Sequence, residues 1–257
     1  HWMVHSFPTR RSSDLARLFI TGVSPVTMDD VTSGFNLGDN ISISPAFNTI
    51  LGFTETDVNA ILDYYISVGE MKLEKETALQ TMKKWYNNYQ FSEACESPVY
   101  NTDAILYFVK EAIRDKKIPS QLIDDNLRMD YGKLQYLIIQ DKALNGNFKR
   151  LTEIINNGGI PSEIKKSFPF DQITQQENFI SLLYFFGLLS FSGSYVEGLP
   201  FLHIPNETIK QMVFEYIRRS FENAYGFSVQ LYELLLLVRK MAYRGEFKEA
   251  FEFIENE

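Results

Sequence analysis

Residues 18–25 read Leu18-Phe19-Ile20-Thr21-Gly22-Val23-Ser24-Pro25. An apolar, β-prone run that stops at a small polar residue and a glycine is typical of a buried parallel strand whose end faces a ligand crevice. No second strand precedes it, so this run predicts a remnant of an α/β sheet. Residues 26–40 are rich in Asp, Ser, Thr, Gly and Asn, which predicts a loop after the strand.

The residues before this strand have a different character. The run from His5 to Leu15 resembles a reading-frame translation of a common sequencing-adapter oligonucleotide, and it joins the strand directly at Ala16. We therefore expect residues 1–15 to be a non-native leader, with a genuine disordered arm as the alternative. A secretion signal is not expected because the segment lacks an apolar core of about seven residues. If the leader is non-native, the natural protein extends further toward its N terminus.

Composition restricts the class of protein. The chain has 257 residues, 45% of them hydrophobic and 14% aromatic, which is enough apolar material for one large or two modest domains. The single cysteine, Cys95, excludes an internal disulfide and a thiolate zinc cage. Two of the three histidines lie in residues 1–15, so few histidine or cysteine side chains remain that could bind a metal ion. We expect a cytoplasmic protein.

Net charge and the length of apolar runs exclude two further classes. The formal net charge is −8, and an acidic chain does not grip nucleic acid over a broad surface because phosphate binding depends on Lys and Arg. The longest apolar clusters, such as residues 231–238, are far shorter than the roughly 18 residues that a membrane span requires. We therefore expect no membrane segment.

Amphipathic helices dominate the first half of the chain after the loop. Two of them begin with a small polar or acidic residue that can cap the first turn, and the helices place apolar residues at helical spacing. The predicted elements are a short apolar stretch at 47–51 ended by Gly52, a helix capped by Thr54 or Thr56, a helix over about 71–87 with Leu73, Leu79, Met82 and Trp85 inward, and a helix capped by Thr102 or Asp103. Helices in series imply a packed α-domain.

The second half combines helices with a β-hairpin. The predicted elements are helices at 131–140, 148–156 and 175–186, a short strand within 160–170, strands at 188–191 and 199–204 joined by a turn at 192–194, and helices at 205–217, 228–243 and 246–256. Three helices followed by a hairpin is the order of a winged helix.

Several short motifs together resemble a known family. They are Ile20-Thr21-Gly22-Val23-Ser24, Ser33-Gly34-Phe35-Asn36, Gly52-Phe53-Thr54-Glu55-Thr56-Asp57-Val58, Trp85-Tyr86-Asn87-Asn88-Tyr89-Gln90-Phe91, Val99-Tyr100-Asn101, Ser181-Leu182-Leu183-Tyr184 and Ile204-Pro205-Asn206. In this order they are similar to the bacterial AAA-ATPase-like proteins that are commonly fused to a C-terminal PD-(D/E)XK nuclease-like domain. One departure is Asn88, where the family usually has glycine; asparagine tolerates a left-handed conformation, so a tight turn remains compatible with it.

The resemblance implies a fold that is mainly α. It comprises a remnant strand of a P-loop ATPase sheet with its loop (16–44), a helical lid (45–122), a winged-helix-like domain with a β-hairpin (123–222) and a helical hairpin that leads to a missing nuclease-like domain (223–257). The implied partners are that domain and a missing N-terminal ATPase core, with a homo-oligomer as a further candidate. Nucleic acid is expected for the intact protein and only weakly for this chain.

The resemblance also implies ATP and Mg²⁺ as cofactors of the intact protein. This chain lacks a Gly-x-x-x-x-Gly-Lys-Ser/Thr loop, so it is expected to bind neither cofactor, to have no catalytic or metal-ligating residue and to be inactive by itself. In AAA-type enzymes the polar residue at the end of this strand, sensor 1, orients the attacking water or contacts the γ-phosphate. Thr21 is the candidate here, and Ser24 is a second one; the alternative is a strand-terminal threonine that caps a turn.

Two motifs leave alternatives open. Residues 85–89 could stack on a cofactor or base, or could pack in the helical core, which is the commoner role of aromatics at a helix end. The recognition helix of a winged helix would be 175–186, which has no Lys or Arg and carries Glu177, and the wing at 192–198 also lacks cations. Partner docking is therefore favoured over groove binding. The competing function is a protein-interaction adaptor that performs no chemistry.

Overall fold

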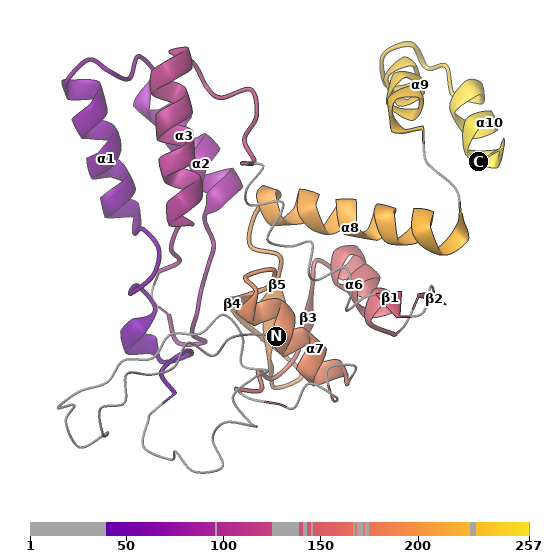
Figure 1. Cartoon of the computed structure of the whole chain (residues 1–257), viewed down its shortest axis with the longest axis horizontal. Helices are drawn as coiled ribbons and strands as arrows, with labels where there is room; N and C mark the ends of the chain where they lie inside the picture. The colour runs from indigo at the N-terminus through magenta and orange to yellow at the C-terminus, as the bar shows by residue number, and fades with distance from the viewer. Residues whose placement is uncertain are drawn as a thin grey trace, which may run out of the picture.

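The computed structural model describes residues 40–95, 97–124, 139–140, 143–144, 146–166, 168, 172, 175–226 and 230–256. Within these ranges the protein is mainly helical, with a three-stranded antiparallel sheet and a separate two-stranded hairpin (Figure 1). The predicted mainly α fold is therefore confirmed. The leader and the predicted strand that contains Thr21 and Ser24 lie outside the described residues.

Three helices lie side by side and form what we call the helical part, residues 45–122 (Figure 1). Its elements are the 3-10 turn η3 (Pro45–Phe47) and the helices α1 (Glu55–Ser67), α2 (Lys75–Tyr86) and α3 (Thr102–Asp115). The Thr54 hydroxyl accepts from the Asp57 backbone N–H at 3.2 Å, and the Asp57 carboxylate accepts from the Thr54 backbone N–H at 2.8 Å. This reciprocal capping box satisfies two amides that the first turn of α1 would leave unpaired.

The start of α2 differs from the prediction by four residues, since α2 begins at Lys75 and not near Met71. Gly69 adopts a φ of 74°, and the backbone amides of Glu70 and Met71 both donate to the carbonyl of Tyr65. These residues therefore close α1, as a left-handed glycine after a helix commonly does.

The cap of α3 also differs from the prediction. Asn101 is the capping residue, and not Thr102 or Asp103: its side-chain oxygen accepts from the Ala104 backbone N–H at 2.9 Å. Asparagine caps as well as aspartate because the short amide reaches the same N–H group.

A buried core joins the three helices. Of the four positions predicted to face inward from the helix over about 71–87, Met82 is fully buried, whereas the other three, Leu73, Leu79 and Trp85, are partly buried at the rim. The buried members of the cluster are Val58, Leu62, Met71, Ala78, Met82, Tyr86, Tyr100, Ala104, Ile105, Phe108, Val109 and Ala112. Helices that share a core of this kind are stabilised by packing and not by helix propensity alone.

The sheet-bearing part follows, built around strands in the order β3-β5-β4, all antiparallel. Its elements are a short hairpin of β1 (Ile139–Gln140) and β2 (Ala143–Leu144), then α6 (Gly146–Asn157), β3 (Gly159–Pro161), α7 (Gln176–Phe185), β4 (Ser190–Val196), β5 (Leu199–His203) and α8 (Glu207–Tyr225). Side chains from α6, α7, β4, β5 and α8 form one buried cluster. The predicted helix at 131–140 is wrong at its end, because residues 139–140 are a strand; residues 131–138 lie outside the described ranges.

The hairpin turn lies at Glu197-Gly198 and not at 192–194 as predicted. Both turn residues have positive φ, 53° and 83°, which is what a two-residue turn needs to match the right-handed twist of the strands. The pairing of β4 with β5 shifts between Phe191 and Tyr195. The Ser-Gly-Ser run is thus absorbed into an irregular stretch of β4, which is longer than predicted, whereas β5 ends one residue before the predicted end at Ile204.

Two helices close the chain, α9 (Leu231–Arg244) and α10 (Lys248–Asn256). They pack as a hairpin at the far end of α8, away from both folded parts (Figure 1). The boundary expected between residues 222 and 223 falls inside α8, which is continuous to Tyr225. No helix in the described ranges combines the length and apolar character that a bilayer span needs.

Candidate functional site at the joint between the two parts

A polar segment, Asn87-Asn88, follows α2 within the helical part. Asn88 adopts a φ of 73°, the left-handed conformation that asparagine tolerates. The segment then runs antiparallel to residues 99–100 through a single bridge between Tyr89 and Val99. We call residues 85–91, together with residues 184–208 that they contact, the joint.

Side-chain amides connect the two sides of the joint. The Asn206 side-chain amide donates to the carbonyl of Asn87 at 2.8 Å, and the Asn88 amide donates to the carbonyl of Pro205 at 3.0 Å. The Thr208 hydroxyl donates to the carbonyl of Trp85 at 2.7 Å. The carbonyls at the end of α2, which have no helical partner, are thus satisfied by side chains from the start of α8.

Strand β4 and helix α7 complete these contacts. The Ser190 hydroxyl accepts from the Gln90 backbone N–H at 2.7 Å and donates to the carbonyl of Asn88 at 2.9 Å. The Tyr184 hydroxyl donates to the carbonyl of Phe91 at 2.9 Å. Burial raises the pKa of Tyr184 far above its usual range, so the phenol stays protonated and remains a donor. These hydrogen bonds join specific partners across the joint and so make the relative position of the two parts specific, although the side-chain oxygen of Asn87 is buried without a partner among the described residues.

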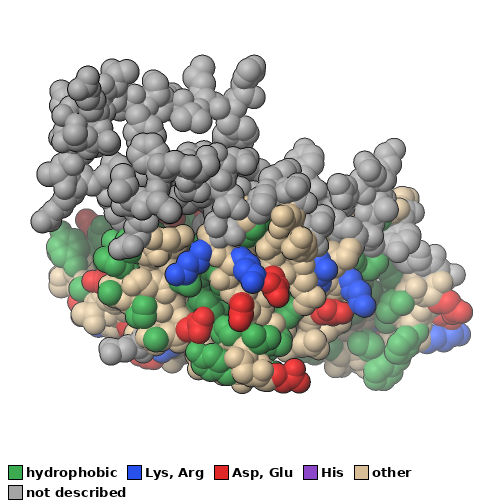
Figure 2. All heavy atoms as spheres, turned by 90° about the horizontal axis from the view of Figure 1, so that it is seen from below, with side chains coloured by type: hydrophobic (Ala, Val, Ile, Leu, Met, Phe, Trp, Pro, Cys, Tyr) green, Lys and Arg blue, Asp and Glu red, His purple; other side chains and the backbone are tan. Residues whose placement is uncertain are grey.

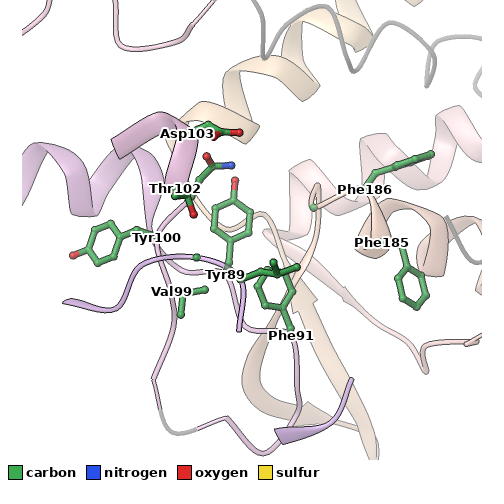
Figure 3. Close-up of a pocket in the computed structure, with 12 residues that line it drawn as sticks. Tyr89, Phe91, Val99, Tyr100, Thr102, Asp103, Phe185 and Phe186 are labelled. Atoms are coloured by element: carbon green, nitrogen blue, oxygen red, sulfur yellow. The ribbon is translucent and has the colours of Figure 1, made fainter. Parts of the chain in front are cut away.

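A pocket of about 280 Å³ opens beside the joint (Figure 3). The Tyr89 ring stands in it with the hydroxyl toward the start of α3, where Thr102 and Asp103 lie, whereas the Tyr100 ring points away. Burial raises the pKa of both Tyr89 and Tyr100 to about 12, so both phenols stay neutral. The lining residues are Leu51, Gly52, Tyr89, Phe91, Val99, Tyr100, Asn101, Thr102, Asp103, Phe185, Phe186 and Gly187. A lining this aromatic suits an apolar group better than proton transfer.

The aromatic motif at 85–89 serves mainly as core. Tyr86 is 1% exposed, its ring meets Phe108 edge to face at 6.3 Å, and its hydroxyl donates to the carbonyl of Leu122 at 2.7 Å. Tyr89 is also buried and reaches the pocket. The packing interpretation therefore accounts for Tyr86, and only Tyr89 is placed to meet a ligand.

The segment expected to act as a recognition helix is buried. Every residue from Asn178 to Tyr184 in α7 is buried, so this helix cannot lie in a major groove without loss of the core. The wing of β4 and β5 is exposed and carries no cation, and Tyr195 on it donates to Glu93 at 3.0 Å. On the face in Figure 2, Lys and Arg side chains alternate with acids and apolar groups. These observations disfavour groove binding by the sheet-bearing part.

The one histidine in the described ranges, His203, and the cysteine, Cys95, do not belong to a cluster of metal-ligating side chains there. His203 lies half-buried on β5, and burial lowers its pKa; its Nδ1 has no hydrogen-bond partner among the described residues. The Cys95 thiol donates to the carbonyl of Ser97 at 2.8 Å. In the described ranges, no three His, Cys, Asp or Glu side chains converge as a metal site would require.

Sequence analysis did not identify the residues that make the joint. Asn87-Asn88 and Pro205-Asn206 each stood out as a motif, but nothing in the sequence indicates that they meet across 119 positions. Thr21 and Ser24, the residues it did propose, lie outside the described ranges. No known protein family, curated protein or solved structure matches the chain.

Proposed function

We propose that this chain is the lid and winged-helix-like portion of an AAA-type ATPase. In the intact protein it would transmit the nucleotide state to a nuclease-like domain that acts on nucleic acid. ATP and Mg²⁺ belong to that intact protein, and this portion performs no chemistry of its own. Thr21 is the residue proposed to sense the γ-phosphate, with Ser24 as the second candidate.

The joint is the observation that carries the proposal. A part that relays motion must move as one body with its neighbour, and buried hydrogen bonds with specific partners fix such an orientation more strictly than apolar contacts do. Here the end of α2 and the start of α8 are tied by side chains of Asn206, Asn88 and Thr208. A displacement of the helical part would therefore move the sheet-bearing part with it.

The arrangement of the sheet-bearing part supports the winged-helix-like assignment. Helix α7 connects β3 to β4, and β5 returns between them, so a short strand and a hairpin form the sheet with a helix in between. Because α7 is buried, we assign this part to contacts with protein and not to reading of base edges.

The proposal is tested first on the gene. The genomic sequence upstream of Ala16 should encode a Gly-x-x-x-x-Gly-Lys-Ser/Thr loop and, on a later strand, an acid pair, since magnesium-dependent hydrolysis of ATP requires both. An upstream region without them would contradict the proposal.

The second test uses the protein. Titration of the 257-residue chain with fluorescent ATP should show no micromolar binding, whereas the extended protein should hydrolyse ATP. In the extended protein, Asn206→Ala should uncouple nucleotide binding from the response of the downstream domain, and Thr54→Ala, which removes the cap of α1, should not. Micromolar binding of ATP by the 257-residue chain would contradict the proposal that ATP binding belongs to the intact protein and not to this portion of it.

A second candidate function, an adaptor that binds proteins without chemistry, is favoured by one observation. The helix α9 has no buried residue although it is rich in leucine. Exposed apolar surface of this kind marks interaction sites on soluble proteins. ATP hydrolysis by the extended protein would exclude a purely adaptor role.

A further inference from the structure

The pocket beside the joint has a negative charge and no positive charge in its lining. Its twelve lining residues include Asp103 and no Lys, Arg or His. Burial raises the pKa of Tyr89 and Tyr100 to about 12, so these two phenols contribute no charge at neutral pH. The carboxylate of Asp103 is therefore the one formal charge among the lining residues.

Asp103 has no counter-ion in the described part of the chain. Its side chain is exposed in the first turn of α3, and it forms no ion pair with a described residue. The other two acids of α3, Glu111 and Asp115, both pair with Arg114. The carboxylate of Asp103 can therefore attract a cation without the loss of an existing ion pair.

Aromatic rings in the same pocket favour the same sign of charge. The rings of Tyr89 and Phe91 lie next to each other in the pocket, with their centroids 6.4 Å apart and their planes 18° apart (Figure 3). Phe185 and Phe186, at the end of α7, also line it. The face of an aromatic ring is negative, and it attracts an ammonium group that lies within about 6 Å of the ring centroid. The rings and the carboxylate together favour a cation with an apolar body.

We propose that the pocket binds a small organic cation, an ammonium or alkylated ammonium group that is carried by one ring or by a short apolar chain. The cationic group lies near Asp103, and the apolar body lies against Tyr89 and Phe91. Ammonium ligands are recognised in proteins by aromatic side chains of this kind. This binding does not depend on ATP hydrolysis by the intact protein.

The N terminus of α3 does not reverse the preference for a cation. Helix N termini attract anions through their free N–H groups and the helix dipole. Here the Asn101 side chain already accepts from the Ala104 N–H at 2.9 Å, and Asp103 places its carboxylate in the same turn. A phosphate would meet that carboxylate with no Lys or Arg in the lining to offset it. The pocket therefore does not suit the phosphates of a nucleotide.

The volume of the pocket sets the size of the ligand. The pocket holds about 280 Å³, just below the roughly 300–1,000 Å³ of sites for drug-sized molecules. We therefore expect a ligand with one ring or a short chain, and a single ammonium group.

The position of the pocket means that its ligand contacts both parts of the protein. Leu51, Tyr89 and Asp103 belong to the helical part, whereas residues 185–187 belong to the sheet-bearing part. A ligand that binds the folded chain and not the unfolded chain stabilises the folded state by mass action. At ten times its dissociation constant, the ligand should raise the thermal midpoint by about 3–6 °C.

The test compares three probes that are close in size and differ in charge: benzylammonium, benzyl alcohol and benzoate. Their binding to the 257-residue chain is measured by saturation-transfer NMR and by titration in about 0.15 M salt. Benzylammonium should bind with a dissociation constant on the order of 1 mM, as expected for a ligand of this size. Benzyl alcohol should bind at least about fivefold more weakly, and benzoate more weakly still, because the cation–π and ionic contacts are lost.

Asp103→Asn tests the contribution of the carboxylate. The variant keeps the shape of the side chain, and it should weaken binding of benzylammonium by about two- to fivefold, since an exposed ionic contact is modest. Binding of benzyl alcohol should not change. Glu76→Gln is the matched control, because it also removes an acid from the first turn of a helix but does not alter the pocket lining. Equal weakening of benzylammonium binding by the two variants would show that net charge alone attracts the probe, which would overturn the proposal.

Phe91→Leu tests the contribution of an aromatic ring. The variant keeps an apolar side chain but removes the ring face, so the preference for benzylammonium over benzyl alcohol should fall by at least about twofold. An unchanged preference in the folded variant would contradict the role of Phe91. Far-ultraviolet circular dichroism and the thermal midpoint show whether the variant folds, and the comparison of the three probes on the wild type decides the proposal in either case.

Two results with the wild type would overturn the proposal. One is binding of benzoate as tight as that of benzylammonium. The other is the absence of benzylammonium binding at about 10 mM, well above the expected dissociation constant. None of the three probes carries a phosphate, so failure of this proposal is distinguishable from failure of the proposed ATPase assignment.

Discussion

The side-chain amide of Asn206 donates to the backbone carbonyl of Asn87 at 2.8 Å, across 119 positions of sequence. The side-chain oxygen of the same Asn206 accepts from the backbone N–H of Ile209 at 3.2 Å and so caps α8. One buried side chain thus sets where α8 begins and fixes that start to the end of α2. This double role explains how two parts with separate apolar cores hold one orientation.

Asn206→Ala should lower the free energy of unfolding by about 2–4 kcal/mol, because it removes a helix cap and leaves the buried Asn87 carbonyl without a partner. Urea denaturation measures the loss. Thr54→Ala is the control: it removes only the cap of α1 and should cost about 1 kcal/mol. Equal losses in the two variants would show that the contact with Asn87 contributes nothing.

Gly159 should not tolerate a side chain. A Cβ at this position in β3 would lie 2.3 Å from the carbonyl oxygen of Leu202 on the paired strand and 2.6 Å from the ring of Phe201. Because the nearest atom belongs to backbone, relief requires the strands to separate, and Gly159→Ala should cost about 3 kcal/mol or more. Thermal unfolding monitored by circular dichroism measures it.

The neighbouring Gly158 provides the control for that variant. Its φ is 74°, but a Cβ added there would have no heavy atom within 4 Å apart from those of its neighbours in the chain. Gly158→Ala therefore carries only the strain of the left-handed conformation, about 1–2 kcal/mol. A larger loss at Gly158 than at Gly159 would contradict the close packing of β3 against β5.

Stability should fall below pH 6.5 because of His203. Burial lowers the pKa of His203 from its ordinary 6.5 in the folded state. As the pH falls through 6.5, the unfolded chain therefore takes up a proton before the folded chain does, and stability declines until the pH passes below the folded-state pKa. Urea denaturation of the wild type and of His203→Gln between about pH 5 and 7.5 isolates this contribution. The advantage of the wild type should shrink toward low pH; a pH-independent difference would contradict the prediction.

The capping box of α1 should contribute measurably to the helical part. Thr54→Ala removes the hydroxyl that accepts from the Asp57 N–H and donates to the Asp57 carboxylate at 2.6 Å, and it should cost about 1 kcal/mol. Thr54→Ser keeps the hydroxyl and should restore most of the stability. The hydrogen bonds from Thr54 also lower the pKa of Asp57, so the Thr54→Ala defect should diminish as this carboxyl is protonated in acid.

The elements that local chemistry specifies could be predicted from the sequence. The helix capped by Thr54, the helix break at Asn87-Asn88 and the helix that begins after Asn206 each carry a capping or breaking residue next to an apolar pattern, and all three are present. Errors occurred where two local signals compete. Ser192-Gly193-Ser194 has turn composition, but the twist of the hairpin favours Glu197-Gly198, which a window of a few residues cannot show.

The sequence by itself determined that this protein is mainly helical, because periodicity and helix caps act within a few residues of one another. Only the tertiary structure decided that the carbonyls at the end of α2 meet the side chains of Asn206 and Thr208, that α7 is buried and that α9 has no buried residue. Those relationships join residues far apart in the chain, and their energy comes from burial and from hydrogen bonds between groups that have no partner locally. No local pattern encodes which distant group will supply that partner.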